Sequence, residues 1–167
     1  MPYIIGMIDV IDAIDRKILD LLQHNARLSN AEMAEAVGLT VSSVHERVKK
    51  MEKKGIITGY VALVDPEKLG KPLTAFVRLT VRSFDTTRES VHHLCATEPD
   101  ILGCYNVAGE DCYILKVRTA GPKQLEKLLS AIRNSADGSR SVTNIVLSTY
   151  KESTRVEPAP VEEEETP

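Results

Sequence analysis

The 167-residue sequence lacks cysteine motifs, other metal-ligand clusters, and membrane-spanning or signal segments, and each absence excludes a class of protein. The chain has three cysteines, Cys95, Cys104 and Cys112, with neither CxxC nor zinc-type spacing. We therefore expect the cysteines to be small core residues of a protein in the reducing cytosol. No metal site is expected either, since His92 and His93 have no carboxylate or cysteine nearby at ligand spacing. No segment reaches the roughly 20 apolar residues of a membrane span, and the opening MPYIIGMIDVIDAID lacks a signal peptide's basic start. We therefore expect a soluble cytoplasmic protein.

An overall excess of basic residues is also missing, because the formal net charge is -3. That total hides a local pattern. The last seventeen residues, KESTRVEPAPVEEEETP, hold six acidic residues against two basic ones, so the rest of the chain is close to neutral. Residues 45–54 hold five Lys or Arg against two Glu. Local positive charge on a neutral body is what a site-specific DNA-binding protein needs, and the total charge does not exclude it.

The first sixty residues have the apolar spacing of helices. IDAIDRKILDLLQHN predicts an amphipathic helix that ends near Asn25, with apolar residues on one face at Ile14, Ile18, Leu21 and Leu22. SNAEMAEAVG follows as a short helix, in which Ser29 and Glu32 have the spacing of a capping box. Gly38 then permits a tight left-handed turn. The order helix, short helix, glycine turn is the first part of a helix-turn-helix motif.

A third, longer helix is predicted from its cap at Thr40 to Lys53 or Lys54, before Gly55. Its apolar stripe is narrow and consists of Val41, Val44, Val48 and Met51. In a helix-turn-helix motif such a helix lies in the DNA major groove, with its N-terminal residues at base edges and its basic end on phosphates. The predicted DNA-contacting residues are Ser42, Ser43, His45, Arg47 and Lys50. The alternatives are a solvated face on a plain helical domain, or intrahelical ion pairs with Glu46 or Glu52.

The second half of the chain changes to the period of two that β-strands show. Residues 56–64 predict a short extended strand, followed by a connector punctuated by proline and glycine. TAFVRLTVRS alternates strictly, so one face of that strand carries Ala75, Val77, Leu79 and Val81. A helix, two strands joined by a tight turn at residues 108–111, another helix and a closing strand follow. The predicted arrangement is β-α-β-β-α-β, which is ferredoxin-like.

These patterns predict an α+β protein with an N-terminal helix-turn-helix (winged-helix-like) domain followed by a ferredoxin-like βαββαβ domain. The predicted boundaries are 8–60 for the DNA-binding domain, 61–73 for a linker strand and connector, and 74–151 for the second domain. Residues 152–167 are rich in proline and glutamate and predict a disordered acidic tail.

The stretch IDRKILDLLQHNARLSNAEMAEAVGLTVSSVHERVKKMEKKGIITGYVALVDPEKLG, followed by VAGEDCYILKVR in the second domain, resembles the Lrp/AsnC (feast/famine) transcription regulators. The resemblance runs from about Ile11 to Lys151. It implies double-stranded DNA binding by the first domain, and dimerisation and amino-acid sensing by the second, with dimers that often assemble into octamers. The first seven residues precede the family-like start, so Met1 and Met7 are both candidate initiators.

The hairpin NVAGEDCYIL is the candidate effector site. In its simplest interpretation Gly109 supplies a turn and the two acids keep the tip soluble. In the functional interpretation Glu110 or Asp111 pairs the ammonium of an amino acid, while backbone N–H groups near Gly109 hold its carboxylate. Relatives often carry an acid where this chain has Cys112. We expect a pocket at the contact between dimers, with the residues Asn106, Val107, Gly109, Glu110, Asp111 and Asn144.

Two other functions remain as alternatives. Certain sirohaem decarboxylases resemble the same two-domain architecture, but they would need histidine and arginine in a cavity of the second domain. The other alternative is a metabolite-binding module that acts on a protein partner. The hairpin acids and the basic third helix favour a regulator that is not an enzyme and has no cofactor besides an amino-acid effector.

Overall fold

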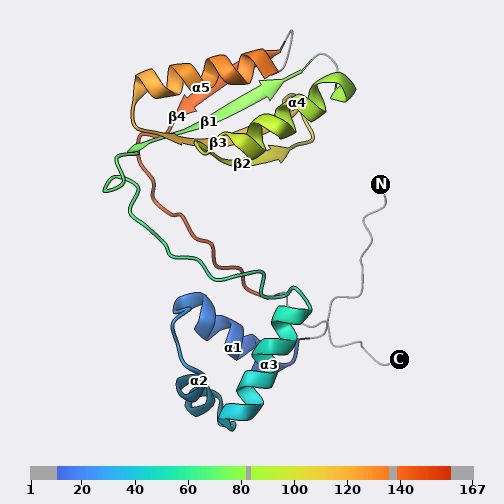
Figure 1. The fold of residues 1–167 in the computed structure, drawn as a ribbon, viewed down its shortest axis with the longest axis vertical. Helices are drawn as coiled ribbons and strands as arrows, with labels where there is room; N and C mark the ends of the chain where they lie inside the picture. The colour runs from blue at the N-terminus through green and yellow to red at the C-terminus, as the bar shows by residue number, and fades with distance from the viewer. Residues whose placement is uncertain (1–10, 82–83, 136–138, 159–167) are drawn as a thin grey trace. The chain divides into compact units, whose positions relative to one another are not determined.

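The computed structural model describes residues 11–81, 84–135 and 139–158, without the side chains of residues 84–87 (Figure 1). The chain divides into two compact units. The first contains the residues up to Leu63 together with the segment that begins at Ser153, and the second contains Val64–Glu152.

The first unit contains three helices, α1 (Ala13–His24), α2 (Asn30–Val37) and α3 (Val41–Lys53). Each begins at a side chain that accepts hydrogen bonds from the backbone N–H groups of the first turn, which have no partner within the helix. These N-caps are Asp12, Ser29 and Thr40. The predicted capping box of Ser29 with Glu32 is present, and Gly38 has the left-handed φ of 72° between α2 and α3.

The core of the first unit is formed by apolar side chains from all three helices. Ile18, Met33 and Val44 are buried there, one from each helix. The predicted stripe of α3 is confirmed at Val44 and Met51, and Val48 is partly buried. Val41 was expected to belong to it but is 51% exposed, because it is the first residue of α3 and lies beyond the helices that cover the stripe.

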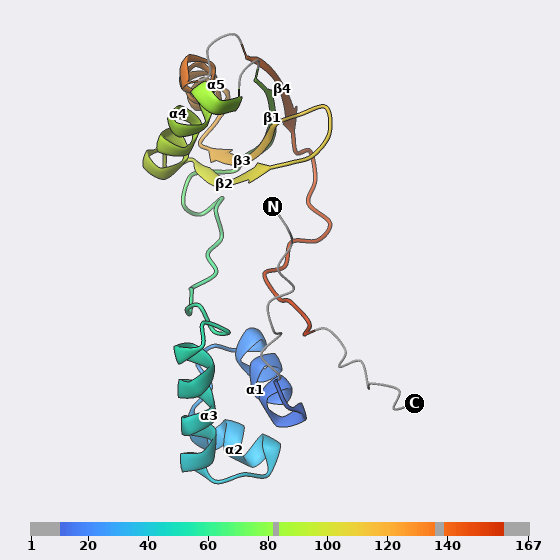
Figure 2. The same cartoon turned by 90° about the vertical axis from the view of Figure 1, so that its right-hand side faces the viewer.

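The second unit contains four strands and two helices in the predicted order. They are β1 (Leu73–Thr80), α4 (Phe84–Thr97), β2 (Ile101–Asn106), β3 (Tyr113–Thr119), α5 (Pro122–Ser135) and β4 (Arg140–Ile145). The strands form one antiparallel sheet in the order β2-β3-β1-β4, and both helices cover the same face of it (Figure 2). The ferredoxin-like prediction is confirmed.

The alternation along β1 separates a buried face of the sheet from an outer face. Ala75, Val77 and Leu79 point toward the helices and are fully buried. Phe76 points the other way and is paired with Lys116 of β3 and Asn144 of β4. The closing strand β4 lies beside β1 at an edge of the sheet.

The three cysteines pack against the core of the second unit as free thiols, as the sequence predicts. Cys104 pairs with Leu115 across β2 and β3, and this register leaves no disulfide between Cys104 and Cys112. Burial raises the pKa of Cys95 to about 12, with a smaller contribution from its hydrogen bond with Cys104. Cys95 is therefore a protonated packing residue at neutral pH.

Two segments differ from the sequence predictions. Residues 58–65 form no strand, because no other described strand pairs with them, and Val61 and Leu63 are 75% and 80% exposed. The expected disordered tail begins with ordered contacts instead, since Glu152 pairs with Lys116, and residues 153–158 lie against α1. Residues 159–167 are outside the described residues.

Candidate DNA-binding face and ligand-binding loop

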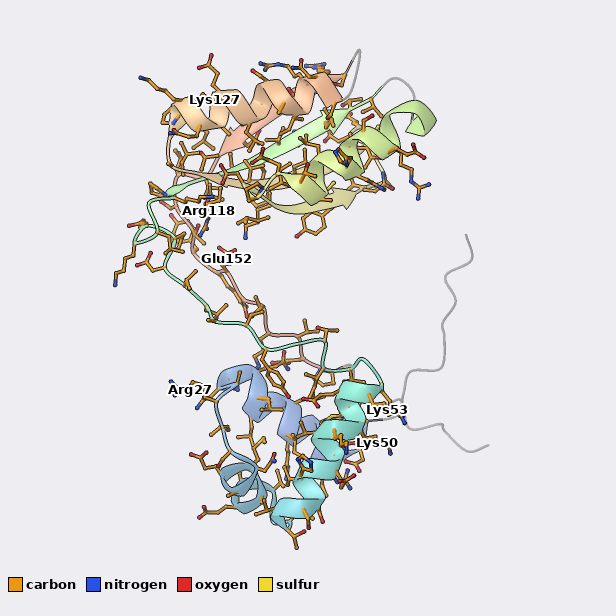
Figure 3. The ribbon with its side chains drawn as sticks, in the orientation of Figure 1. Arg27, Lys50, Lys53, Arg118, Lys127 and Glu152 are labelled. Atoms are coloured by element: carbon orange, nitrogen blue, oxygen red, sulfur yellow. The ribbon has the colours of Figure 1, made fainter. Side chains whose placement is uncertain are left out.

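The exposed face of α3 is built from residues that share one side of the helix. At about 100° per residue, Ser42, Lys49 and Lys53 lie opposite the buried side chains of Val44 and Met51, together with Glu46. Ser43 and Lys50 lie at the flank of this face, on the side of Arg47. Figure 3 shows Lys50 and Lys53 on this helix. The face therefore combines small hydroxyls in its first turns with ammonium groups further along, which is the composition that base edges and phosphates require.

The N-terminus of α3 holds a small cluster of hydroxyl groups. Thr40 Oγ1 accepts a hydrogen bond from Ser43 N–H at 3.2 Å and lies 3.1 Å and 2.8 Å from the Oγ atoms of Ser42 and Ser43. All three side chains are exposed. The cap therefore fixes these hydroxyls at the end of the helix that is expected to enter the groove.

Arg47 is tied to α1 rather than to a neighbour on its own helix. Its Nη1 donates to Asp12 Oδ2 at 2.6 Å and to Asp15 Oδ1 at 2.8 Å, and the Arg47 side chain is 31% exposed. The carboxylates raise the pKa of Arg47 further, Asp12 having the larger effect. Sequence reasoning named Arg47 but missed both partners, because pairs between helices have no sequence spacing. Arg47 thus links α3 to α1, and its contact with DNA stays a prediction.

His45 lies at the opposite border of the same face. Its Nδ1 is 3.3 Å from the side-chain nitrogen of Asn30, the first residue of α2. The two borders of the face are thus anchored by two different helices, Arg47 by α1 and His45 by α2. Lys50 lies between them, and within the described residues its ammonium has no hydrogen bond or ion pair.

The connection between β2 and β3 spans residues 107–112, which is longer than the tight turn predicted at 108–111. Its ends are fixed by hydrogen bonds. The backbone N–H of Val107 and the side-chain nitrogen of Asn106 both donate to the carbonyl of Cys112, and Cys112 N–H donates to the carbonyl of Leu79 at 2.9 Å. Gly109 has a φ of 144°, which side chains with a Cβ rarely adopt. The loop is therefore anchored to the end of β1, with an exposed tip.

The two acids of this loop have different surroundings. Asp111 Oδ2 accepts from Arg78 Nε at 2.6 Å, and Asp111 also contacts the hydroxyl of Thr80 at 3.5 Å. This pair raises the pKa of Arg78, and Glu110 contributes to the same shift from further away. Glu110 itself is exposed at the tip. Its carboxylate is the one that remains available to a ligand.

Asn144 lies opposite Phe76, two residues along the sheet from the level of Arg78. The closing-strand residue that is paired with Arg78 is Val142. The structure therefore brings Val107, Gly109, Glu110 and Asp111 together in one loop, with Asn106 next to it at the end of β2. Asn144 is on a different row of the sheet.

The chain matches two family profiles that divide it as the structure does. Residues 11–58 match a winged helix-turn-helix DNA-binding family, and residues 74–156 match the Lrp/AsnC ligand binding domain. Among its relatives are the DNA-binding transcriptional activator DecR of Escherichia coli K12 (39% identical; 81% of this chain and 90% of DecR) and the HTH-type transcriptional regulator LrpA of Mycobacterium tuberculosis (37% identical; 86% and 95%).

Solved structures agree with these matches. A feast or famine regulatory protein from M. tuberculosis, complexed with L-methionine, is 36% identical with a TM-score of 0.82, covering 89% of this chain and all of that one. A transcriptional regulator of Neisseria meningitidis, also an L-methionine complex, is 30% identical with a TM-score of 0.81, covering 88% and 96%.

The fold and the two sites define a DNA-binding transcription regulator with a separate ligand-binding domain. With relatives this similar over most of its length, the chain belongs to the Lrp/AsnC family. Its relatives are regulators and not enzymes, which removes the decarboxylase alternative.

The part of the chain that the structure describes contains no group of three or more His, Cys, Asp or Glu that could hold a metal ion. None of the helices in the same residues has the length and apolar content needed to cross a bilayer.

Replacing Lys50 by alanine should weaken DNA binding by about 1 kcal/mol, because one phosphate contact is lost, and should reduce the salt dependence by about one ion. The measurement is a gel shift with the promoter region of the protein's own gene at several salt concentrations. Lys127→Ala removes the same charge from α5 and serves as the control (Figure 3). Equal losses in the two variants would show that α3 is not the DNA-binding face.

The Arg47 pair should make the stability of the first unit sensitive to acid. The hydrogen bond from the backbone of Asp15, and then the one from Arg47, lower the pKa of Asp12 below its ordinary 3.8. A lowered folded-state pKa stabilises the fold above pH 4, and that stabilisation disappears as the pH falls through the folded value.

Asp12→Asn keeps a capping side chain but removes the charge, so it should cost up to about 1 kcal/mol at pH 7 and almost nothing near pH 2. Thermal unfolding followed by helical circular dichroism between pH 2 and 7 measures this difference. The control Glu35→Gln removes an exposed carboxylate from α2. A constant difference between Asp12→Asn and wild type across this range would rule out the linkage.

Proposed function

We propose that this Lrp/AsnC regulator acts in the cytoplasm as a dimer or a larger assembly up to an octamer, and that a mid-sized amino acid bound beside loop 107–112 at the contact between dimers controls it. The observation that supports assembly most strongly is the outer face of the sheet. No helix of the second unit's described residues covers this face, and apolar side chains are exposed on it, including Phe76, Tyr105 and Val142.

Most charged side chains of this outer face are already paired; among the described residues the exception is Arg140, which is exposed beside Thr80 at the start of β4. Arg78 pairs with Asp111, Lys116 pairs with Glu152, and Arg118 lies 3.7 Å from a carboxylate oxygen of Glu152 (Figure 3). Burying an unpaired charge is costly, whereas paired charges can be covered with much less penalty. A face with apolar side chains and paired cations is therefore suited to contact a second copy of itself about a two-fold axis. Such an axis also matches the two half-sites of an imperfect palindrome in DNA.

Replacing Phe76 by aspartate should turn the protein into a monomer, because an unpaired carboxylate would be buried at the centre of the interface. Sedimentation velocity at micromolar concentration should show a dimer or a larger species for the wild type and a monomer for Phe76→Asp. Leu69→Asp, on the exposed connector, is the matched control and should assemble normally. A monomeric wild type would contradict the proposed assembly.

The loop provides complementary groups for the two charged ends of an amino acid. Glu110 would pair with the ammonium, since Arg78 already occupies Asp111, and backbone N–H groups near Gly109 would hold the carboxylate. Val107 is partly buried and would contact the side chain of the ligand. The exposed tip cannot enclose a ligand alone, so a second dimer would provide the other wall, and binding would shift the assembly and the spacing of the DNA-binding units. The methionine complexes of two similar structures support an amino acid of this size.

Calorimetry across the common amino acids should detect binding to the wild type at millimolar concentration or below. Glu110→Gln should weaken it by about tenfold, because a charge-assisted hydrogen bond is lost, whereas Glu126→Gln on α5 should leave it unchanged. Gly109→Thr should also weaken binding, since a β-branched residue is strained at a φ of 144°. If none of the amino acids binds the wild type, or if Gly109→Thr binds equally well, the assignment of the pocket to this loop is wrong.

A further inference from the structure

The segment after the second unit makes specific contacts along the outer side of α1. Arg155 Nη2 donates to Asp20 Oδ1 at 2.6 Å, and Arg155 Nη1 lies 3.0 Å from His24 Nε2. The amide of Gln23 bonds both backbone groups of Val156. Its oxygen accepts from the N–H at 2.7 Å, and its nitrogen donates to the carbonyl at 3.0 Å. These contacts fix both the side chain and the main chain of the segment.

The chemistry of His24 is consistent with this contact. Its Nδ1 is 2.8 Å from the carbonyl oxygen of Asp20, so a proton on Nδ1 would be donated there. In the neutral tautomer that carries this proton, Nε2 has a free lone pair that can accept a hydrogen bond from Arg155. Asp20, Gln23 and His24 thus present a carboxylate, an amide and an imidazole acceptor on one side of α1, and residues 155–156 have the matching donors and acceptor.

The segment runs antiparallel to α1, toward the end where α1 contacts α3. Further along, Arg16 Nη1 donates to the carbonyl of Pro158 at 3.2 Å. Arg16 follows Asp15, which pairs with Arg47 of α3. The last described residue, Pro158, is therefore held at the first turns of α1, the end at which Asp12 and Asp15 contact Arg47 of α3.

Four consecutive glutamates, Glu162–Glu165, follow this anchored point in the sequence. An extended chain covers at most about 3.3 Å per residue, so Glu162 can lie up to about 13 Å from Pro158 and Glu165 up to about 23 Å. Lys50 lies one helical turn, about 5 Å, beyond Arg47. The glutamates can therefore reach the ammonium groups of α3. They also lie beyond residue 156, where the match to the ligand-binding family ends.

We propose that the outer side of α1 (Arg16, Asp20, Gln23 and His24) is the docking surface for residues 153–158 of this chain, and that docking holds Glu162–Glu165 next to α3, where they compete with DNA phosphates. The contact between this segment and α1 is weak, because its ion pair is exposed to solvent. The Arg155 and Asp20 side chains are 37% and 49% exposed, and exposed ion pairs contribute little. Because the segment is covalently attached, a weak contact is enough to raise the local concentration of glutamate near α3, and DNA can still displace it.

Docking can be tested in the absence of DNA. Trypsin cleaves after Arg155 only when that side chain is free to enter the protease, so docking should slow this cleavage. Gln23→Ala and Asp20→Ala should each speed cleavage after Arg155 by roughly three- to tenfold, because the segment is released more often. Cleavage after the exposed Arg27 of the same unit is the internal control and should not change (Figure 3). Unchanged cleavage after Arg155 in both variants would overturn the docking surface.

The effect on DNA needs a variant that leaves the charge unchanged, and Gln23→Ala meets this condition. Both Gln23→Ala and the replacement of Glu162–Glu165 by glutamine should raise DNA affinity by roughly two- to tenfold at low salt, and the gain should fade as salt screens it. Combining the two should give no more than the glutamine replacement alone. The charge control replaces Glu67, Glu89, Glu98 and Glu126 by glutamine and should give a smaller gain.

An unchanged affinity in the Glu162–Glu165 variant, or additive effects in the combination, would overturn the competition with DNA. If the wild type and all variants bind no DNA, the DNA-binding assignment itself fails, and the trypsin result still decides whether the segment docks.

Discussion

The pairing of β1 with a neighbour on each side is the interaction on which the second unit depends. Through this pairing, Ala75, Val77 and Leu79 are fully buried beneath the two helices. Because side chains alternate between the two faces of a sheet, the residues between these three must face away from the helices. Phe76 and Arg78 are on the outer face for this reason. The proposed assembly surface and the anchor of the proposed ligand loop are thus both consequences of how β1 is buried.

In the first unit the corresponding constraint is electrostatic. The ammonium groups on the exposed face of α3 repel one another, and only a narrow apolar stripe packs α3 against the other two helices. Carboxylates at the start of α1 bind Arg47, and Asn30 of α2 contacts His45. Both contacts are at the borders of the exposed face and leave its centre free. Rigid borders around a free centre keep the side chains that are expected to contact DNA in fixed positions relative to each other.

Local rules in the sequence were enough to predict most of the fold. The capping box of Ser29, the left-handed turn at Gly38 and the alternation along β1 involve residues close in sequence, and all are confirmed. Ion pairs between residues far apart in the sequence could not be predicted, because no sequence spacing identifies the partner of a charged side chain. For this reason the roles of Arg47, Asp111 and Arg155 became visible only in three dimensions. The expected strand at 56–64 failed because β-propensity cannot provide a partner strand.

The Arg78–Asp111 pair connects the outer face of the sheet with the ligand loop, since Arg78 belongs to one and Asp111 to the other. If both surfaces act as proposed, ligand binding and self-association are thermodynamically linked, and each must alter the other by the same factor. Self-association depends on how much protein is present. The amino-acid concentration that gives a half-maximal response is then a property of the cell's supply of this regulator as well as of the pocket. Changes in its expression would retune the sensor without any change in its sequence.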